Sequence, residues 1–406
     1  PPPPAEPPPL AELHGDDDHG HGTHVAGSAA GDGTDSSGAH AGIAPEAQLL
    51  FHAIEQSGGL GGIPNDVGDM FDLAVANGSR IHTNSWGSCY VDSNGDCYEW
   101  GIYTSRSMQI DSSARTNDEL VILFAAGNDG YDSNGDSDTE EDTIIFEAVS
   151  KNVITIGASE SLRSGTTGLS WPQSYSDNSE GMVDWSGRGP ADDGRTKPDF
   201  ATPGSNIYST RSREPGADGT GNYHSMSGTS MATPLAAGST ALLLEHMIEN
   251  RNLADPTSSL IKAIFAASAH DMLGQYSSAV IGAGRDAPNN HEGNGLIDLW
   301  SAMNASYVQK ESVSTGDERG WSFAVPLSAP DLRLSLSYTD PAASVASSTQ
   351  LVNDLDIAIK DPAGTWTNLS DDLNNLRVVD FANPAQGSWE VHILGTSVPT
   401  GPQFFS

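Results

Sequence analysis

The chain has 406 residues, 36% of them hydrophobic, which is enough for one large domain and a second, smaller one. Its formal net charge of −36 argues against nucleic acid and against an anionic membrane surface, because both need a basic partner face. No run of about 18 apolar residues predicts a membrane span, and no signal peptide is recognisable, so secretion would require a signal upstream of Pro1.

The first segment of the chain, PPPPAEPPPLAEL (residues 1–13), is rich in proline. Proline removes the donors that a central strand needs, so the segment is expected to be a polyproline II stretch, a linker or an artefact of the sequence.

From residue 14 to residue 305, short apolar runs alternate with helical patterns. We expect strands at 47–54, 80–87, 119–128 and 152–159, and a long buried helix at 230–251. Three of the strands are apolar almost throughout, as buried parallel strands are. This pattern predicts a doubly wound, mostly parallel α/β sheet.

The sequence pattern changes near residues 306–315. Five short, partly alternating runs follow, separated by Gly, Pro and Asn: WSFAVPL, LRLSLSYT, LDIAIKD, LRVVDF and SWEVHIL. They predict a smaller all-β sandwich, jelly-roll-like, over residues 310–406.

Three motifs carry groups suited to catalysis. Ser230, in GTSMATP, opens the long helix, where unpaired N–H groups favour negative charge, although a serine there also serves as a simple cap. Asn128, in AAGNDG, follows the most apolar strand, where its amide can donate to an oxyanion or only shape a turn. His21 and His24, in HGTHVAG, share a helix face, but the sequence has no H-E-x-x-H and zinc is not expected.

Taken in order, HGTHVAG, NSWGS, AAGN and GTSMATP resemble the motifs of the subtilisin-like serine proteases, over about residues 14–305. The later part is similar to the branch with a C-terminal β-sandwich, found in certain alkaline, oxidation-resistant bacterial subtilases. The resemblance implies an endopeptidase in which Ser230 is the acylated nucleophile and His21 the general base. Asn128 and the Ser230 backbone N–H would hold the oxyanion, and His24 would be structural.

The resemblance also implies where a peptide substrate binds. An extended peptide would pair with the chain at Ser85, Trp86 and Gly87 and, on its other side, near residues 57–62, including Gly58 and Gly59. One wall of the primary specificity pocket would consist of Ala125, Ala126 and Gly127. Asp129, next to the oxyanion asparagine, would favour a basic side chain there.

The catalytic aspartate of this family follows a buried strand some thirty to forty residues before the histidine. Only twenty residues precede His21, and none of them has that pattern. Asp16, Asp17 and Asp18 match the polar loop of the family instead, so no catalytic aspartate is assigned. We expect that the N-terminal strand carrying it is missing from this sequence rather than that the acid was lost by substitution.

Two further features concern metal and redox chemistry. In DSNGDSDTEED (132–142), Asp132, Asn134, Asp136 and Asp138 alternate as hard oxygen ligands do, which predicts a structural Ca²⁺ site or else a solvated acidic loop. The only two cysteines, Cys89 and Cys97, form either a small disulfide, which an extracellular protein favours, or two free thiols. No organic cofactor is expected.

These observations predict a secreted, extracellular serine endopeptidase that acts on protein or peptide substrates. We expect a monomer, with a propeptide as an optional folding partner. The rival hypothesis is a catalytically dead, subtilase-like binding or scaffold protein that lacks the triad aspartate.

Overall fold

The computed structural model describes residues 17, 19–55, 60–93, 97–131, 139–162, 176, 178–213, 221–272 and 287–406. Its helices are α1 (His21–Ala30), the 3-10 helix η1 (Thr34–Ser36), α2 (Gly68–Ala76), α3 (Ser105–Thr116), α4 (Thr229–Glu245), the π-helical turn η2 (His246–Asn250), α5 (Ser258–Ser268) and α6 (Leu299–Met303). Within this described part, no helix is long and apolar enough to cross a bilayer.

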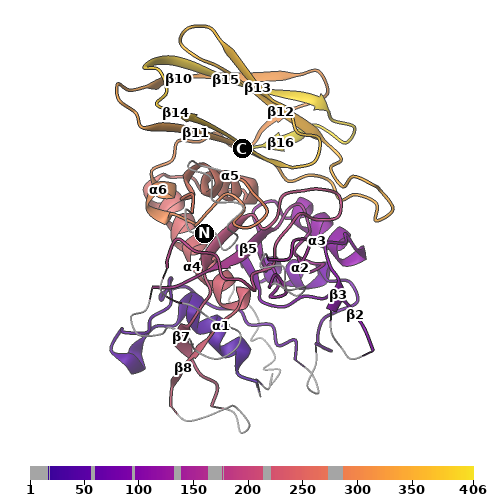
Figure 1. The fold of residues 1–406 in the computed structure, drawn as a ribbon, viewed down its shortest axis with the longest axis vertical. Helices are drawn as coiled ribbons and strands as arrows, with labels where there is room; N and C mark the ends of the chain where they lie inside the picture. The colour runs from indigo at the N-terminus through magenta and orange to yellow at the C-terminus, as the bar shows by residue number, and fades with distance from the viewer. Residues whose placement is uncertain are drawn as a thin grey trace, which may run out of the picture.

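A parallel sheet with strand order β1-β4-β5-β6 forms the centre of the first unit (Figure 1). Its strands are β1 (Ile81–Asn84), β4 (Val121–Ala125), β5 (Ile154–Ser159) and β6 (Phe200–Pro203). Every residue of β4 and β5 is buried, as the apolar runs predict. On β4, Val121 and Leu123 join the core formed with α4 and α5, whereas Ile122 and Phe124 join the core formed with α2 and α3. The doubly wound α/β fold is therefore confirmed.

The prediction of one strand in this unit is wrong. Residues 47–54 form no strand in the structure. A strand needs a neighbour for its backbone groups, and no described strand pairs with this segment. The segment instead forms one wall of a cavity whose opposite wall is β1.

Short antiparallel ribbons complete the first unit. The strands β2 (Tyr90–Val91) and β3 (Cys97–Glu99) form one hairpin, and β7 (Ile207–Thr210) pairs with β8 (Tyr223–Met226) just before α4.

The C-terminal part is antiparallel, which confirms the all-β expectation. It contains β9 (Glu311–Val313), β10 (Glu318–Val325), β11 (Asp331–Ser337), β12 (Asp354–Lys360), β13 (Trp366–Leu369), β14 (Leu376–Ala382), β15 (Gly387–Ser397) and β16 (Gln403–Phe405). They form a sheet of order β10-β15-β12-β13 and the pairs β11-β14 and β16-β9. Alternate residues of β12, namely Leu355, Ile357 and Ile359, are buried in a core shared with Trp389 and Ile393.

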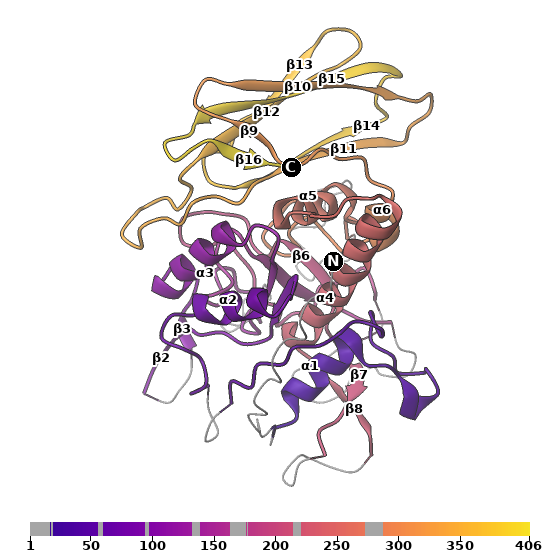
Figure 2. The same ribbon diagram turned by 180° about the vertical axis from the view of Figure 1, so that it is seen from behind.

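A buried polar contact joins the two units, which lie against each other at α5 (Figure 2). Lys151 Nζ donates to Asp340 Oδ2 at 2.5 Å and to the carbonyls of Pro341 and Gln350 at 2.6 and 2.7 Å. Both charged side chains are 0% exposed. Asn152 adds a second link, because its amide accepts from the Asp340 N–H at 2.8 Å and donates to the Asp340 carbonyl at 2.8 Å. The C-terminal sheets are thus fixed to the residues that lead into β5.

Helix α1 packs closely against β7, and the contacts join the backbone of each element to side chains of the other. Gly27 has no side chain, and a Cβ there would lie 1.9 Å from Thr210 Oγ1. His24 is fully buried, with Nε2 3.1 Å from the Ile207 carbonyl and its ring 5.1 Å from that of His224. Burial, together with the nearby His224, lowers the pKa of His24 to about 4. His24 is therefore a neutral, structural side chain at neutral pH.

The Lys151–Asp340 pair yields a stability prediction. Lys151→Met leaves a buried carboxylate without its cation, so the free energy of unfolding is expected to fall by about 3–5 kcal/mol. Adding Asp340→Asn removes the stranded charge and should restore much of that loss. Urea denaturation of both variants measures this, and a double variant as unstable as the sum of the single ones would contradict it.

The pKa of His24 yields a prediction for pH dependence. Because the folded-state pKa lies below the unfolded value of about 6.5, the stabilisation is complete above pH 6.5 and is lost as pH falls toward 4. His24→Gln keeps an amide donor for the Ile207 carbonyl but cannot titrate. Between pH 7.5 and pH 5 the unaltered protein should lose about 2 kcal/mol more unfolding free energy than the variant. Parallel stability curves for the two proteins would contradict this assignment.

Candidate active site

Ser230 lies in the first turn of α4, at the carboxyl ends of the parallel strands. Two hydrogen bonds tie it to the residue after β1: Ser230 Oγ donates to the Ser85 carbonyl at 3.3 Å, and Ser85 Oγ donates to the Ser230 carbonyl at 2.8 Å. Gly228 precedes the helix with a φ of 157°, so the chain turns sharply into α4. The nucleophile predicted from the sequence is thus held at a helix N-terminus, where negative charge is stabilised.

Asn128 follows β4 and faces the same turn. Its Oδ1 accepts from the Thr229 backbone N–H at 2.9 Å and lies 3.0 Å from Thr229 Oγ1. Because these contacts occupy the amide oxygen, the two N–H groups of Nδ2 remain to donate outward. Asn128 is therefore hydrogen-bonded to Thr229, the residue that precedes Ser230, and its Nδ2 group is free to donate.

His21 is the first residue of α1. Burial, with the neighbouring His19, lowers the pKa of His21 below its usual value, and Asp17 opposes this shift. Asp17 itself caps the helix, since its carboxylate accepts from the backbone N–H groups of Gly20 at 3.1 Å and Thr23 at 2.8 Å. This use of Asp17 agrees with the expectation that it is not the catalytic acid.

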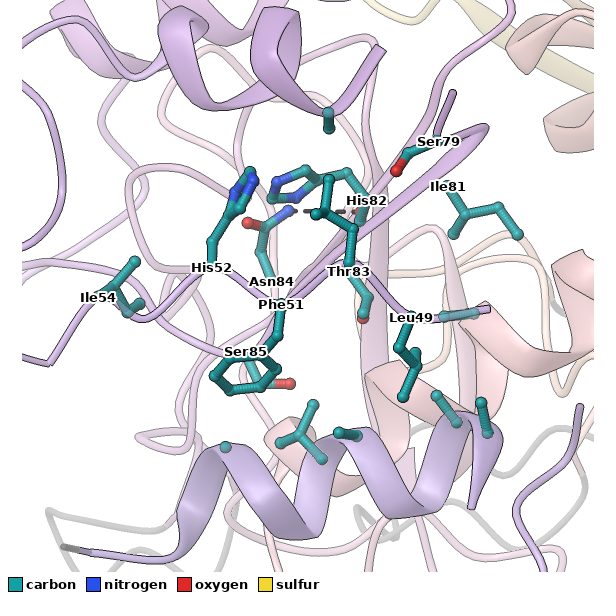
Figure 3. A pocket seen from close by; sticks show the side chains of 18 of the residues that line it. Leu49, Phe51, His52, Ile54, Ser79, Ile81, His82, Thr83, Asn84 and Ser85 are labelled. Atoms are coloured by element: carbon teal, nitrogen blue, oxygen red, sulfur yellow. Dashed lines mark hydrogen bonds between the residues drawn. The ribbon is translucent and has the colours of Figure 1, made fainter. Parts of the chain in front are cut away.

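A large cavity connects His21 to the Ser85 loop. It has a volume of about 1070 Å³ and extends along β1 between α1, α4 and residues 47–55. Figure 3 shows the His52 and His82 rings side by side within it. His21 and Ser85 both line the cavity, and Ser230, which is not one of the lining residues, is hydrogen-bonded to Ser85. The Ser230 hydroxyl is directed to Ser85 rather than to His21, which is common for catalytic groups without substrate.

Ile145 lies beside both Gly87, of the predicted peptide-pairing segment, and Gly127, of the predicted pocket wall. A Cβ on Gly87 would lie 2.1 Å from Ile145 Cδ1, and a Cβ on Gly127 would lie 3.0 Å from Ile145 Cγ2. Ile145 is held there because its backbone N–H donates to the Ala126 carbonyl at 3.0 Å. Glu147 Oε2 would also lie 3.2 Å from the Gly87 Cβ, and the Thr143 carbonyl 3.2 Å from the Gly127 Cβ, so the space beside these two glycines is tightly filled.

The remaining predicted wall residues have structural contacts of their own. Ala125 and Ala126 are buried at the end of β4. The Trp86 indole donates to Asn84 Oδ1 at 3.1 Å and packs on Phe124. Asp129 is half-buried, and burial raises its pKa above the usual aspartate value.

Several sequence predictions fall on residues that are not described. Gly58, Gly59, Asp132, Asn134, Asp136 and Asp138 lie outside the described ranges, so the calcium site and the second substrate-binding segment stay predictions. Among the residues that are described, no group of three or more His, Cys, Asp and Glu side chains is arranged to hold a metal ion. Cys89 and Cys97 are joined by a disulfide that closes the β2–β3 hairpin.

Two residues of the site escaped the sequence analysis. Thr229, which orients Asn128, lies inside the GTSMATP motif, but its role needs the contact with a loop 101 positions away. Ile145 lies in the connection between β4 and β5, and only its packing against two glycines reveals it. The glycines at positions 87 and 127 were the sequence signal that another side chain packs closely against the backbone there.

Comparison with known proteins places the chain in a family. The model of the subtilase family matches residues 6–295. The chain is 25% identical to the serine protease/ABC transporter B family protein tagD of Dictyostelium discoideum, over 98% of this chain and 29% of that protein. It is 33% identical to the serine protease AprX of Bacillus subtilis, over 56% of this chain and 49% of AprX.

A structural relative is fervidolysin from Fervidobacterium pennivorans, a keratinolytic enzyme, with a TM-score of 0.49, 19% identity, and coverage of 92% of this chain and 46% of that one. The chain spans half or less of the length of these three proteins. Because the family model matches most of its length, the chain belongs to the subtilase family.

Proposed function

We propose that this protein is a serine endopeptidase that hydrolyses peptide bonds through an acyl-enzyme on Ser230. The observation that carries the proposal is the turn at which α4 begins. There Thr229, the residue before Ser230, donates to Asn128 Oδ1, which leaves the Asn128 Nδ2 group to donate, and the Ser230 hydroxyl is held at the Ser85 carbonyl. A nucleophile between two oxyanion donors is the arrangement that acyl transfer requires.

The residues then act in sequence. Ser230 Oγ leaves its contact with the Ser85 carbonyl and attacks the peptide carbonyl carbon while His21 accepts the hydroxyl proton. Asn128 Nδ2 and the Ser230 backbone N–H donate to the oxyanion of the tetrahedral intermediate. His21 returns the proton to the leaving amine, and water releases the acyl group by the same steps in reverse. The lowered pKa of His21 keeps the imidazole neutral, and thus able to accept a proton, at neutral pH.

The catalytically inactive binding protein is the alternative. One observation favours it: in the described part of the chain, no carboxylate receives a hydrogen bond from the His21 ring. An imidazole without that partner loses orientation and stabilisation of its charged form, at a cost of about 10⁴-fold in kcat. A reagent that reacts with the serine itself is therefore a more sensitive probe than substrate turnover.

We also propose a preference for small side chains at the residue that precedes the cleaved bond. The support is Ile145, whose side chain fills the space beside both Gly87 and Gly127. The preference for basic residues expected from Asp129 is a separate proposal, because Asp129 lies outside this contact.

The cellular setting of the protein is a further proposal. A disulfide and an acidic surface fit a secreted protein that acts outside the cell on protein or peptide substrates. A structural calcium ion held by Asp132, Asn134, Asp136 and Asp138, a monomeric state and a folding propeptide complete this proposal.

Covalent labelling tests the proposed function. A fluorophosphonate should label Ser230, and mass spectrometry of the digested protein should locate the adduct there. His21→Ala should slow labelling by about 10²–10⁴-fold, the usual contribution of a general base. Asn128→Ala should slow it by about 10²–10³-fold, the contribution of one oxyanion donor in the reference enzymes of this family.

The control for this test is Ser225→Ala, which alters an exposed serine of β8 and should label at the unaltered rate. Labelling that is equally fast in the His21→Ala variant, or that is found on another serine, would favour the binding-protein hypothesis.

Ile145 is tested by substrate-like inhibitors. Peptide boronates that end in Ala or Phe compete with the fluorophosphonate for Ser230, and the unaltered protein should bind the Ala compound more tightly. Ile145→Ala should shift the Ala-to-Phe affinity ratio by at least about tenfold toward Phe, the effect of one or two methylenes in a fitted pocket. Asp129→Asn is the matched control and should leave this ratio unchanged. An unchanged ratio in Ile145→Ala would contradict the role assigned to Ile145.

A further inference from the structure

A small cavity between the two units is lined mainly by basic side chains. It has a volume of about 240 Å³, and its walls include residues 195–199 of the first unit and residues 374–378 of the second. The two units lie against each other at α5, which adds one lining residue (Figure 2). Five of the 18 basic side chains of the chain line the cavity, and each is at most 3% exposed: Lys151, Arg195, Lys197, Lys262 and Arg377.

The acidic side chains of the lining are already engaged. Within the described part of the chain they are Asp199, which is buried, and Asp371, which is not. The Asp199 carboxylate is shared between Lys197 Nζ and Lys262 Nζ, each at 2.8 Å. The Asp371 carboxylate accepts from two backbone N–H groups of its own loop, at 2.9 and 3.1 Å. Two buried lysines therefore depend on one buried carboxylate.

The two arginines of the lining each keep a buried nitrogen without an acceptor among the described residues. Arg195 Nε donates to Asp193 at 2.8 Å and Nη1 to the Val149 carbonyl at 2.6 Å, but Nη2 has no partner. Arg377 Nη2 donates to Asp354 at 2.6 Å, whereas its Nε has no partner. Buried charged donors without acceptors are costly, and an anion in the cavity that both side chains line would supply them.

The cations of the first unit also repel one another. Burial lowers the pKa of Lys197 to about 7; Asp199 opposes this shift, whereas the neighbouring charges of Lys262 and Arg195 add to it. The cluster therefore lacks negative charge. The rest of the chain, with a net charge of −36, repels anions from its surface, so this cavity is the place where one would be retained.

We propose that the cavity binds one tetrahedral oxyanion, inorganic sulfate or phosphate, between the two units. The planar guanidinium of Arg195 suits two oxygens of such an anion, Lys197 adds an ammonium donor, and Arg377 contributes from the second unit. A water molecule takes up about 30 Å³ of liquid, so the cavity has room for an oxyanion and several waters. The bound anion would hold the C-terminal sheets to the first unit, independently of the proposed peptidase function.

Equilibrium dialysis of radiolabelled sulfate against the full chain tests the proposal. We expect one sulfate per chain with a Kd below about 1 mM, because at least two charge-assisted hydrogen bonds are available. The measurement is made in about 0.15 M sodium chloride, which screens the repulsion of sulfate by the acidic surface. Phosphate should displace the labelled sulfate, whereas acetate at the same concentration should not.

Two variants assign the binding to the cavity. Lys197→Met leaves Lys262 to pair with Asp199 but removes one donor, and it should weaken sulfate binding by at least about tenfold. Arg195→Lys keeps the positive charge but loses the planar fork, and we expect a similar loss. The matched control is Lys360→Met, which removes a lysine of β12 outside the cavity and should leave binding unchanged.

Hydrogen exchange of the unaltered protein locates the bound ion. The Thr196 N–H already donates to Asn374 Oδ1 at 3.0 Å, from one unit to the other. With about 10 mM sulfate, tenfold above the expected limit of Kd, exchange should slow at residues 195–197 and 374–378, on both walls. Slowing confined to these segments separates binding at the site from the general stabilisation that sulfate gives by its exclusion from protein surfaces.

Each outcome decides the proposal. The site is refuted if the unaltered protein binds no sulfate, or if Lys197→Met and Arg195→Lys both bind it as tightly as the control. Displacement by acetate or by added chloride, but not by phosphate, would overturn the oxyanion assignment. Slower exchange in one unit alone would refute the bridge between the units. Because dialysis and exchange of the unaltered chain suffice to refute the proposal, it stays testable even if a variant does not fold.

Discussion

The two hydrogen bonds between Ser85 and Ser230 are the contact on which the site depends. They join the loop after β1 to the first turn of α4, two segments 145 positions apart in the chain. Thr229 makes the corresponding contact with Asn128 after β4. The sheet therefore fixes Ser230 and Asn128 relative to each other, because Asn128 follows the fully buried β4 and Ser85 follows the partly buried β1.

Many of the basic side chains of the protein are buried. At least seven of the 18 basic side chains are buried: Lys151, Arg188, Arg195, Lys197, Arg211, Lys262 and Arg377. Several of them pair with buried carboxylates, as Lys197 and Lys262 do with Asp199. Seven acidic side chains are buried as well, namely Asp111, Glu147, Glu160, Asp199, Asp271, Glu292 and Asp340. The remaining side chains therefore keep the strong acidic excess of the composition, which keeps the protein hydrated but makes the compact state sensitive to salt.

The sequence predicted much of this arrangement, because short motifs mark the ends of strands and the starts of helices. The run before Asn128 became β4, and the long helix begins at Thr229. The strand at 47–54 failed for a physical reason: its composition suits a sheet, but pairing depends on a neighbour that the pattern of one segment does not specify. Ile145 and the Lys151–Asp340 pair were equally hidden, since both arise from contacts between segments far apart in the chain.

The proposed oxyanion donors are positioned by β4 and α4, because Asn128 follows β4 and the Ser230 N–H lies in the first turn of α4. Among the described residues, no carboxylate receives a hydrogen bond from the His21 ring. In the proposed mechanism, the donors are therefore held by the sheet and the helix, whereas the orientation of His21 is not set by any described carboxylate.

The central claim is that Ser230 and Asn128 form one oxyanion site, and a crystal structure of the phosphonylated protein tests it most directly. We expect an adduct on Ser230 Oγ whose phosphoryl oxygen lies within about 2.7–3.1 Å of both Asn128 Nδ2 and the Ser230 backbone nitrogen. An adduct on Ser230 whose phosphoryl oxygen points into solvent, away from the Asn128 amide, would contradict it.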